Sequence, residues 1–297
     1  IFCRCDILNI KKLKHVIFNF KPDVIFHLAA ESHVDQSIEK PKLFIDNNII
    51  GTFNLLDVSR QYLRINNNNN FKFVHVGTDE VFGEITNKNK FFDEKTCYSP
   101  NSPYSASKAA SNHLVRAWFK TFNVPGVITN SSNNFGPFQH PEKFIPKIIS
   151  CLLYDKKIPV YGKGNQKRDW LYVKDHAEAL FLAYKRGLPG ESYNFGTGIT
   201  IKNIDLIKTI YQIMTKKFEN KRFNNLNYYI NFVKDRPGHD LCYRINNSKA
   251  KKNLKWKPTL NFKKKLEETI DWYINNEIWL NEKIKKNKVF KRIGLIK

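Results

Sequence analysis

The sequence predicts an α/β fold in which a doubly wound parallel sheet is joined to a smaller α+β part. In the first half, short apolar runs alternate with amphipathic stretches, which is the pattern of β-α units that feed a parallel sheet. The second half is less regular and has shorter strand-like runs. With 297 residues, of which 41% are hydrophobic, the chain can bury a large core. We therefore expect one two-part domain or two domains.

In the first half, runs rich in β-branched and aromatic residues predict strands, and apolar residues at helical spacing predict the helices between them. A run of Asn at 66–70 separates a predicted helix from a strand and indicates a surface loop. The predicted strands are 24–28, 71–77 and 126–131, and the predicted helices are 11–19, 41–63 and 105–122.

The same patterns, in shorter form, predict the elements of the second half. No internal repeat is present in the sequence. The predicted strands are 158–161, 170–173 and 193–195, and the predicted helices are 175–185, 204–217 and 266–275.

The beginning of the chain lacks a feature that such a sheet normally has. A dinucleotide-binding sheet opens with a strand, a glycine-rich turn and a helix whose N-terminus holds the pyrophosphate. The 13 glycines form no GxGxxG or GxxGxxG after a strand, and the chain starts with Ile rather than Met. Residues 1–7 are interpreted as a third strand. We therefore expect a fragment that lacks the first two strands, with roughly 50 to 60 residues and the glycine-rich turn upstream.

Composition excludes several classes of protein. No apolar run approaches the roughly 20 residues that cross a bilayer, and Arg4 and Asp6 interrupt the segment where a signal peptide would be apolar. The five cysteines include no CxxC and no zinc spacing with His, so we expect neither a disulfide framework nor a metal site. These features favour a soluble protein of the reducing cytoplasm, without a membrane partner.

The formal charge of +23 raises the question of a nucleic-acid partner, because basic surfaces bind phosphate backbones. The lysines are scattered along the whole chain and accompanied by Asn, which indicates a compositional bias and a solvated basic surface. We therefore expect no nucleic-acid partner.

Tyr104 and Lys108 lie four residues apart, which places both side chains on one face of a helix. A neighbouring ammonium would lower the pKa of Tyr104 toward neutrality, as a general base requires. The spacing alone is a weak signal, because a surface Lys beside a half-buried Tyr has the same pattern.

Thr78, Asp79 and Glu80 directly follow a strongly apolar predicted strand. Ligands of open parallel sheets bind at the carboxyl ends of the strands. Two adjacent carboxylates in a cleft are driven to different pKa values and can serve as an acid and a base. A helix N-cap or a turn is the alternative interpretation of this triplet.

These two groups belong to a series of short motifs that are spread along the chain. The motifs are HLAAESHVD at 27–35, TDEVFG at 78–83, SPYSASK at 102–108, SNNFGP at 132–137, PEK at 141–143, YGKG at 161–164, RDWLYV at 168–173 and DRPGHD at 235–240. Their order and spacing, which hold from residue 1 to about 275, resemble those of the dTDP-glucose 4,6-dehydratase family of extended short-chain dehydrogenases/reductases.

Related families resemble the chain less well. Epimerases share the Tyr and Lys spacing but lack the acid pair Asp79 and Glu80, so the resemblance implies dehydration. GDP-mannose dehydratases differ in the acidic site, and plant-type UDP-glucose 4,6-dehydratases usually lack the Arg-Asp-Trp and Arg-Pro-Gly-His forms. A dTDP-sugar is therefore the favoured substrate, with UDP-glucose as the alternative.

The resemblance implies a Rossmann-type fold and an NAD-dependent hydro-lyase that converts dTDP-glucose to dTDP-4-keto-6-deoxyglucose in deoxysugar biosynthesis. It implies that Tyr104 takes the proton of the 4-hydroxyl, that Lys108 holds the nicotinamide ribose, and that Thr78 bonds the 4-oxygen. It further implies that Glu80 removes the C5 proton while Asp79 protonates the departing 6-hydroxyl.

The resemblance also assigns binding residues. Those expected at NAD are Asp6, Ile7, Leu28, Ala29, Ala30, Asn48, Tyr104, Lys108 and Asn134. Those expected at the substrate are Ser32, His33, Asn133, Lys143, Tyr161, Arg168, Asn203, Arg236 and His239. The positions that depart from the usual residues of the family are Cys5, Gly77, Phe82 and Phe135.

By resemblance, the chain divides into an NAD-binding domain and a sugar-nucleotide-binding domain. The first covers 1–135 and is rejoined by 167–195 and 254–276, and 136–297 is mainly the second. A homodimer through the helices 41–63 and 105–122 is implied by analogy. A non-catalytic sugar-nucleotide-binding remnant is the alternative from another class, because the glycine-rich turn is missing, but the presence of every catalytic residue argues against it.

Overall fold

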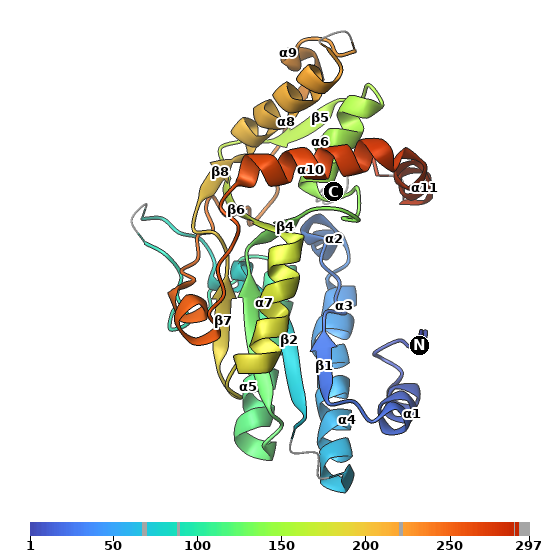
Figure 1. Cartoon of the computed structure of the whole chain (residues 1–297), viewed down its shortest axis with the longest axis vertical. Helices are drawn as coiled ribbons and strands as arrows, with labels where there is room; N and C mark the ends of the chain where they lie inside the picture. Colours follow the sequence, from blue (N-terminus) through green and yellow to red (C-terminus); the bar gives the residue numbers. More distant parts are fainter. Residues whose placement is uncertain (67–69, 88–89, 220–221, 288, 291–297) are drawn as a thin grey trace.

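A four-stranded parallel sheet with the order β1-β2-β3-β7 forms the centre of the computed structural model, which describes residues 1–66, 70–87, 90–219, 222–287 and 289–290 (Figure 1). Its register places His27 beside His75 and Thr78 beside Ser131, so the carboxyl ends of the strands meet at one edge. The predicted parallel sheet is confirmed, with strands at β1 (Val24–His27), β2 (Lys72–Thr78), β3 (Gly126–Ser131) and β7 (Ser192–Phe195).

Helices cover both faces of this sheet because successive strand residues point to opposite faces. Phe73 and Ile128 pack with α1 (Ile10–Phe20), α4 (Gly51–Asn66) and α5 (Pro103–Phe122) on one face. Val74 and Val127 pack on the other face against α7 (Val173–Arg186), which lies in front of the sheet in Figure 1. The sheet is therefore doubly wound, as predicted.

The prediction of a strand at residues 1–7 is wrong. These residues pair with no neighbour in the described structure, and a strand exists only through hydrogen bonds to an adjacent strand. The segment is held differently: the Asn54 side-chain amide donates to the carbonyl of Ile7 over 3.0 Å, and the Asp6 carboxylate accepts from the backbone N–H of Leu8 over 2.9 Å.

The helix predicted at 41–63 is interrupted. It consists of α3 (Pro41–Phe44), a π-helical turn (Ile45–Ile50) and α4. The wide turn carries Asn48, whose amide accepts from the N–H of Glu31 over 2.8 Å and donates to the carbonyl of Glu31 over 3.0 Å. π-helical turns occur often at functional sites, and this one fastens the segment that follows β1. The short helix α2 (Val34–Glu39) after that segment was not predicted.

A second group of elements lies beyond the carboxyl edge of the sheet (Figure 1). It contains a three-stranded sheet of β4 (Asn133–Phe135), β6 (Lys167–Tyr172) and β8 (Thr200–Lys202), and a pair of β5 (Ile158–Tyr161) and β9 (Ile230–Val233). Its core is formed mainly by α6 (Phe144–Leu153), α8 (Asn203–Lys217) and α10 (Phe262–Asn275). The remaining elements are a 3-10 turn (Asp79–Phe82), α9 (Leu226–Tyr229), a second π-helical turn (Ala250–Leu254) and α11 (Glu277–Asn287).

Sequence patterns located most of these helices, but α6 was missed, because its residues are buried almost all round and show no polar face. Residues 67–69 of the predicted Asn loop lie outside the described residues. Among the helices that the structure describes, none combines the length and apolar character needed to span a membrane.

Candidate active site

A cavity of about 250 Å³ opens at the carboxyl edge of the central sheet, between the two groups of elements. Ser32, Asp35 and Glu80 reach it from the first half of the chain, and Arg168 and Arg236 from the second. All of the predicted substrate-binding residues line this one cavity, although they come from distant parts of the sequence. They are Ser32, His33, Asn133, Lys143, Tyr161, Arg168, Asn203, Arg236 and His239.

The acid pair sits where β2 ends. Thr78 is the last residue of the strand, and its hydroxyl caps the following 3-10 turn by accepting from the N–H of Glu80 over 3.3 Å. Gly83 ends the turn with φ +78°, a conformation that favours glycine. The turn buries Asp79 almost completely and places Glu80 in the wall of the cavity.

The two carboxyl groups have different electrostatic surroundings. Burial raises the pKa of Asp79 well above its usual value, and the negative charges of Glu80 and Asp169 add to this effect. Burial also raises the pKa of Glu80, but the cationic Arg236 and Arg168 oppose that rise. Both carboxyl groups therefore hold a proton more readily than a solvated carboxyl, and the rise in pKa is larger for Asp79. This difference is consistent with Asp79 as the acid and Glu80 as the base.

Asp79→Asn tests this electrostatic difference through stability. Because Asp79 binds its proton more tightly in the folded protein than in the unfolded chain, folding loses stability as pH rises from the ordinary Asp pKa through the raised one. The variant cannot ionise, so its free energy of unfolding relative to the parent should increase from about pH 5 to about pH 9. Thermal unfolding at both pH values measures this, with Asp271→Asn, in an ion pair with Lys217 on the surface, as the charge-matched control. A difference that does not grow with pH contradicts the assignment.

Helix α5 presents Tyr104 at the same edge because of how the helix begins. The Ser102 hydroxyl accepts from the N–H of Ser105 over 3.1 Å, and the Ser105 hydroxyl accepts from the N–H of Ser102 over 3.0 Å. This capping box, with Pro103 in the first turn, fixes the start of the helix. Tyr104 and Lys108 are thereby both buried, one helical turn apart.

The predicted lowering of the Tyr104 pKa by Lys108 is wrong for this arrangement. Burial raises the pKa of Tyr104, the charge of Glu80 raises it further, and a hydrogen bond with Thr78 opposes the rise. The Lys108 ammonium instead donates to the backbone carbonyl of Val76 over 2.7 Å, and burial lowers its pKa to about 8. Burial of the phenol and the charge of Glu80 therefore decide the direction of the Tyr104 pKa.

Five of the predicted cofactor residues come from two short segments, one after β1 and one near the start of the chain. Leu28, Ala29 and Ala30 follow β1 directly, and they are exposed. They form an open surface, with small side chains at Ala29 and Ala30, at the carboxyl edge of the sheet. The second segment contains Asp6 and Ile7. The Ile7 carbonyl is bonded to Asn54 of α4, and the Asp6 carboxylate accepts from the N–H of Leu8, so neither residue is part of a strand.

Asn134, another predicted cofactor residue, lies in β4. Its amide nitrogen donates to the carbonyl of Ser132 over 3.2 Å, and its buried amide oxygen has no hydrogen-bond partner among the described residues. This oxygen is free to accept a hydrogen bond from a ligand.

Cationic side chains face the cavity from several elements. The Lys143 ammonium donates to the carbonyl of Ser32 over 2.6 Å, which ties the start of α6 to the segment after β1. Arg168 donates to the carbonyl of Asp240 over 2.9 Å. Together with Arg236 these groups can bind an anion. Across the described residues, no cluster of His, Cys, Asp or Glu could hold a metal ion.

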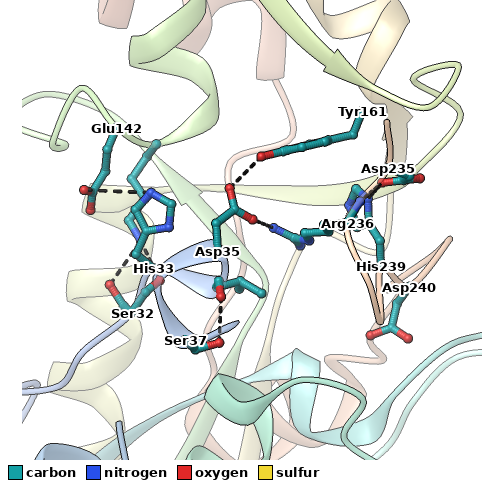
Figure 2. Close-up of polar contacts among 12 residues, drawn as sticks. Ser32, His33, Asp35, Ser37, Glu142, Tyr161, Asp235, Arg236, His239 and Asp240 are labelled. Carbon is teal, nitrogen blue, oxygen red and sulfur yellow. Dashed lines mark hydrogen bonds and ion pairs between the residues drawn. The ribbon is translucent and has the colours of Figure 1, made fainter. Parts of the chain in front are cut away.

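Asp35 is a cavity residue that the sequence analysis missed. Its carboxylate accepts from an Arg236 Nη over 3.0 Å and from the Tyr161 hydroxyl over 2.7 Å (Figure 2). Asp35 closes the motif that contains Ser32 and His33, both assigned to the substrate. Its place in the same motif as these two residues is the sequence signal that could have identified Asp35 as a site residue.

The chain matches the family model described as GDP-mannose 4,6 dehydratase over residues 1–269. A dTDP-glucose 4,6-dehydratase from Escherichia coli is 44% identical, over 99% of this chain and 85% of the relative. Another, from Haemophilus influenzae, is 43% identical, over 93% of this chain and 83% of the relative.

Solved structures of dTDP-glucose 4,6-dehydratases are also similar to this chain. A dTDP-glucose 4,6-dehydratase from Bacillus anthracis in complex with NAD superposes with a TM-score of 0.82 at 37% identity, over 95% of this chain and 82% of that chain. One from Streptomyces venezuelae, with NAD and dTDP bound, has a TM-score of 0.84 at 34% identity, over 94% and 81% of the two chains.

Proposed function

Because this chain belongs to the dTDP-glucose 4,6-dehydratase family, within the wider group described as GDP-mannose 4,6 dehydratase, we propose that it converts dTDP-glucose to dTDP-4-keto-6-deoxyglucose. The observation that carries this proposal is the acid pair at the end of β2: Asp79 is buried in a setting that favours its protonated form, and Glu80 reaches the cavity beside arginines. Removal of water from a sugar needs such an acid and base.

The residues present fit NAD as the resident cofactor. The open surface at 28–30 and the unpaired amide oxygen of Asn134 lie at the edge that carries the Tyr104 and Lys108 pair. Asn48 holds the open surface in place through Glu31. NAD would supply a group that accepts a hydride from C4 of the sugar and returns one to C6. Asp6 and Ile7 complete the proposed cofactor residues.

The residues of the chain perform the proton transfers. Tyr104 takes the proton of the sugar 4-hydroxyl, and its contact with Thr78 orients both hydroxyls toward that oxygen. Lys108 follows Tyr104 by one turn of α5, and its buried ammonium would stabilise negative charge as the phenol loses its proton. Burial raises the pKa of Tyr104, so this nearby cation is needed when the proton leaves.

The acid pair then removes water. Glu80, whose carboxylate form is favoured by Arg236 and Arg168, takes the C5 proton that a 4-ketone acidifies. Asp79, kept protonated by burial, gives its proton to the departing 6-hydroxyl. Glu80 afterwards returns a proton to C5, so the reaction causes no net oxidation.

The remaining residues bind the sugar nucleotide. Lys143, Arg168 and Arg236 provide the charge that a diphosphate requires, and His33 and His239 lie in the same wall. Residues 1–135, with 167–195 and 254–276, form the NAD-binding domain in this proposal, and 136–297 mainly form the sugar-nucleotide-binding domain.

We further propose a cytoplasmic homodimer that acts in deoxysugar biosynthesis. Partly exposed aromatic side chains on α4 and α5 support the dimer: Phe53 and Trp118 have ring centroids 5.7 Å apart, and Phe122 lies 5.4 Å from Trp118. Such a surface is typical of helices that pair between subunits.

Conversion of dTDP-glucose by the protein, expressed from its complete reading frame, tests the proposed function. The expected product has a C6 methyl group and a C4 ketone, both visible by NMR, and UDP-glucose in parallel tests the alternative substrate. Equal rates with dTDP-glucose and UDP-glucose would contradict the proposed preference for dTDP. No conversion of either sugar nucleotide would contradict the proposed dehydratase activity.

A further inference from the structure

A three-residue contact joins the two groups of elements across the cavity. Asp35 comes from α2, Tyr161 from the end of β5 and Arg236 from the loop after β9 (Figure 2). The Asp35 carboxylate uses one oxygen for Arg236, at 3.0 Å, and the other for the Tyr161 hydroxyl, at 2.7 Å. The Asp35 and Arg236 side chains are only 11% and 16% exposed, so solvent screens this ion pair weakly.

The guanidinium of Arg236 keeps donors that this contact does not use. Its buried Nε has no hydrogen-bond partner within the described part of the chain. Arg236 also lines the cavity, and its guanidinium carbon lies 6.0 Å from the centre of the Tyr161 ring. An arginine binds phosphate best when its planar fork is held in one orientation.

Without Asp35, the charges around Arg236 would act against that orientation. Glu80 in the same cavity attracts the Arg236 guanidinium, while Arg168 and Lys143 repel it, so none of these charges holds it where Asp35 does. A long side chain that is free to turn also loses more entropy when a ligand fixes it. The Asp35 carboxylate reduces both the effect of these charges and the loss of entropy, because it anchors one side of the guanidinium before any ligand binds.

We propose that Asp35 is a positioning residue for the sugar-nucleotide diphosphate. It holds Arg236 by one nitrogen so that the free donors face the cavity, and it ties Tyr161 to the same carboxylate. This inference rests on the proposed function, since it takes a nucleoside diphosphate as the ligand of the cavity.

Asp35→Asn keeps the shape of the side chain and removes its charge, which makes it the direct test. Titration of the protein with dTDP, which lacks the sugar, should give a Kd about 10-fold higher than that of the parent, or about 1.4 kcal/mol. KM for dTDP-glucose should rise in parallel, and kcat should fall by a smaller factor, because Asp35 contacts none of the residues assigned to the reaction and influences Glu80 only through Arg236. The thermal midpoint and the bound NAD content should remain those of the parent.

Three further variants make the test specific. Tyr161→Phe, which leaves the Asp35 and Arg236 ion pair in place, should raise the Kd in the same direction by a smaller factor. Asp35→Glu, which keeps the charge, should restore part of the affinity. Asp271→Asn, which removes a carboxylate from an ion pair outside the cavity, should leave the Kd unchanged.

An Asp35→Asn variant that binds dTDP as tightly as the parent, or more tightly, overturns the inference, and tighter binding would mean that Asp35 competes with the diphosphate for Arg236. If Asp35→Asn does not fold, an unchanged Kd in Tyr161→Phe overturns it instead. A parent that binds dTDP but does not convert dTDP-glucose would reject the proposed function alone. A parent that binds no dTDP would reject both.

Discussion

Tyr104→Phe is expected to lower kcat by about 10³-fold or more, because the first proton of the reaction has no acceptor without the phenolic oxygen. The ring packs against Phe44 with centroids 6.3 Å apart, and the variant retains that contact, so folding should be preserved. Single-turnover absorbance of reduced nicotinamide should show no signal, since the step that reduces the cofactor requires the same proton transfer.

Tyr98→Phe is the matched control for this change. The Tyr98 hydroxyl accepts from the Asn112 amide over 2.9 Å outside the cavity, so the control removes a phenolic oxygen without touching the site. Its kcat should stay within a few-fold of the parent. A Tyr104→Phe variant that still reduces the cofactor would show that another group takes the 4-hydroxyl proton.

Glu80→Gln is expected to lower kcat by about 10²- to 10⁴-fold while the signal of reduced nicotinamide persists. The amide cannot take the C5 proton, so the reaction should stop after the 4-ketone has formed and before water leaves. The same single-turnover absorbance measures this, and comparison with Tyr104→Phe separates the two steps.

Glu84→Gln controls for the loss of a carboxylate in the same loop. The Glu84 carboxylate accepts from the backbone N–H of Leu241 over 2.5 Å and does not line the cavity, so turnover should change little. Equal loss of the absorbance signal in Glu80→Gln and Tyr104→Phe would reject the assignment of Glu80 to the second step.

Much of the central sheet could be predicted because its signals are local. The predicted strand 126–131 coincides with β3, whose residues are all buried. Its β-branched residues Val127, Ile128 and Thr129 favour a strand. The start of α5 is also local, because Ser102, Pro103 and Ser105 cap their own helix. The substrate residues were found through the motifs and not through any periodicity.

The features that escaped prediction depend on contacts between distant residues. Asp35 and Arg236 lie 201 residues apart in the sequence, and no local pattern encodes their ion pair. The raised pKa of Tyr104 results from burial and from Glu80, which spacing to Lys108 cannot reveal. Residues 1–7 resemble a strand in composition but make no sheet hydrogen bonds in the described structure.

The fate of the C4 hydrogen shows whether the hydride moves from C4 to C6 of the same sugar, as the proposed dehydration requires. With dTDP-glucose that carries deuterium at C4, the deuterium should appear in the C6 methyl group of the product, as measured by NMR and mass spectrometry. The reason is that the hydride taken from C4 is returned to C6 of the same sugar within one closed site. Deuterium that remained at C4, or that was lost to solvent, would contradict the proposed reaction.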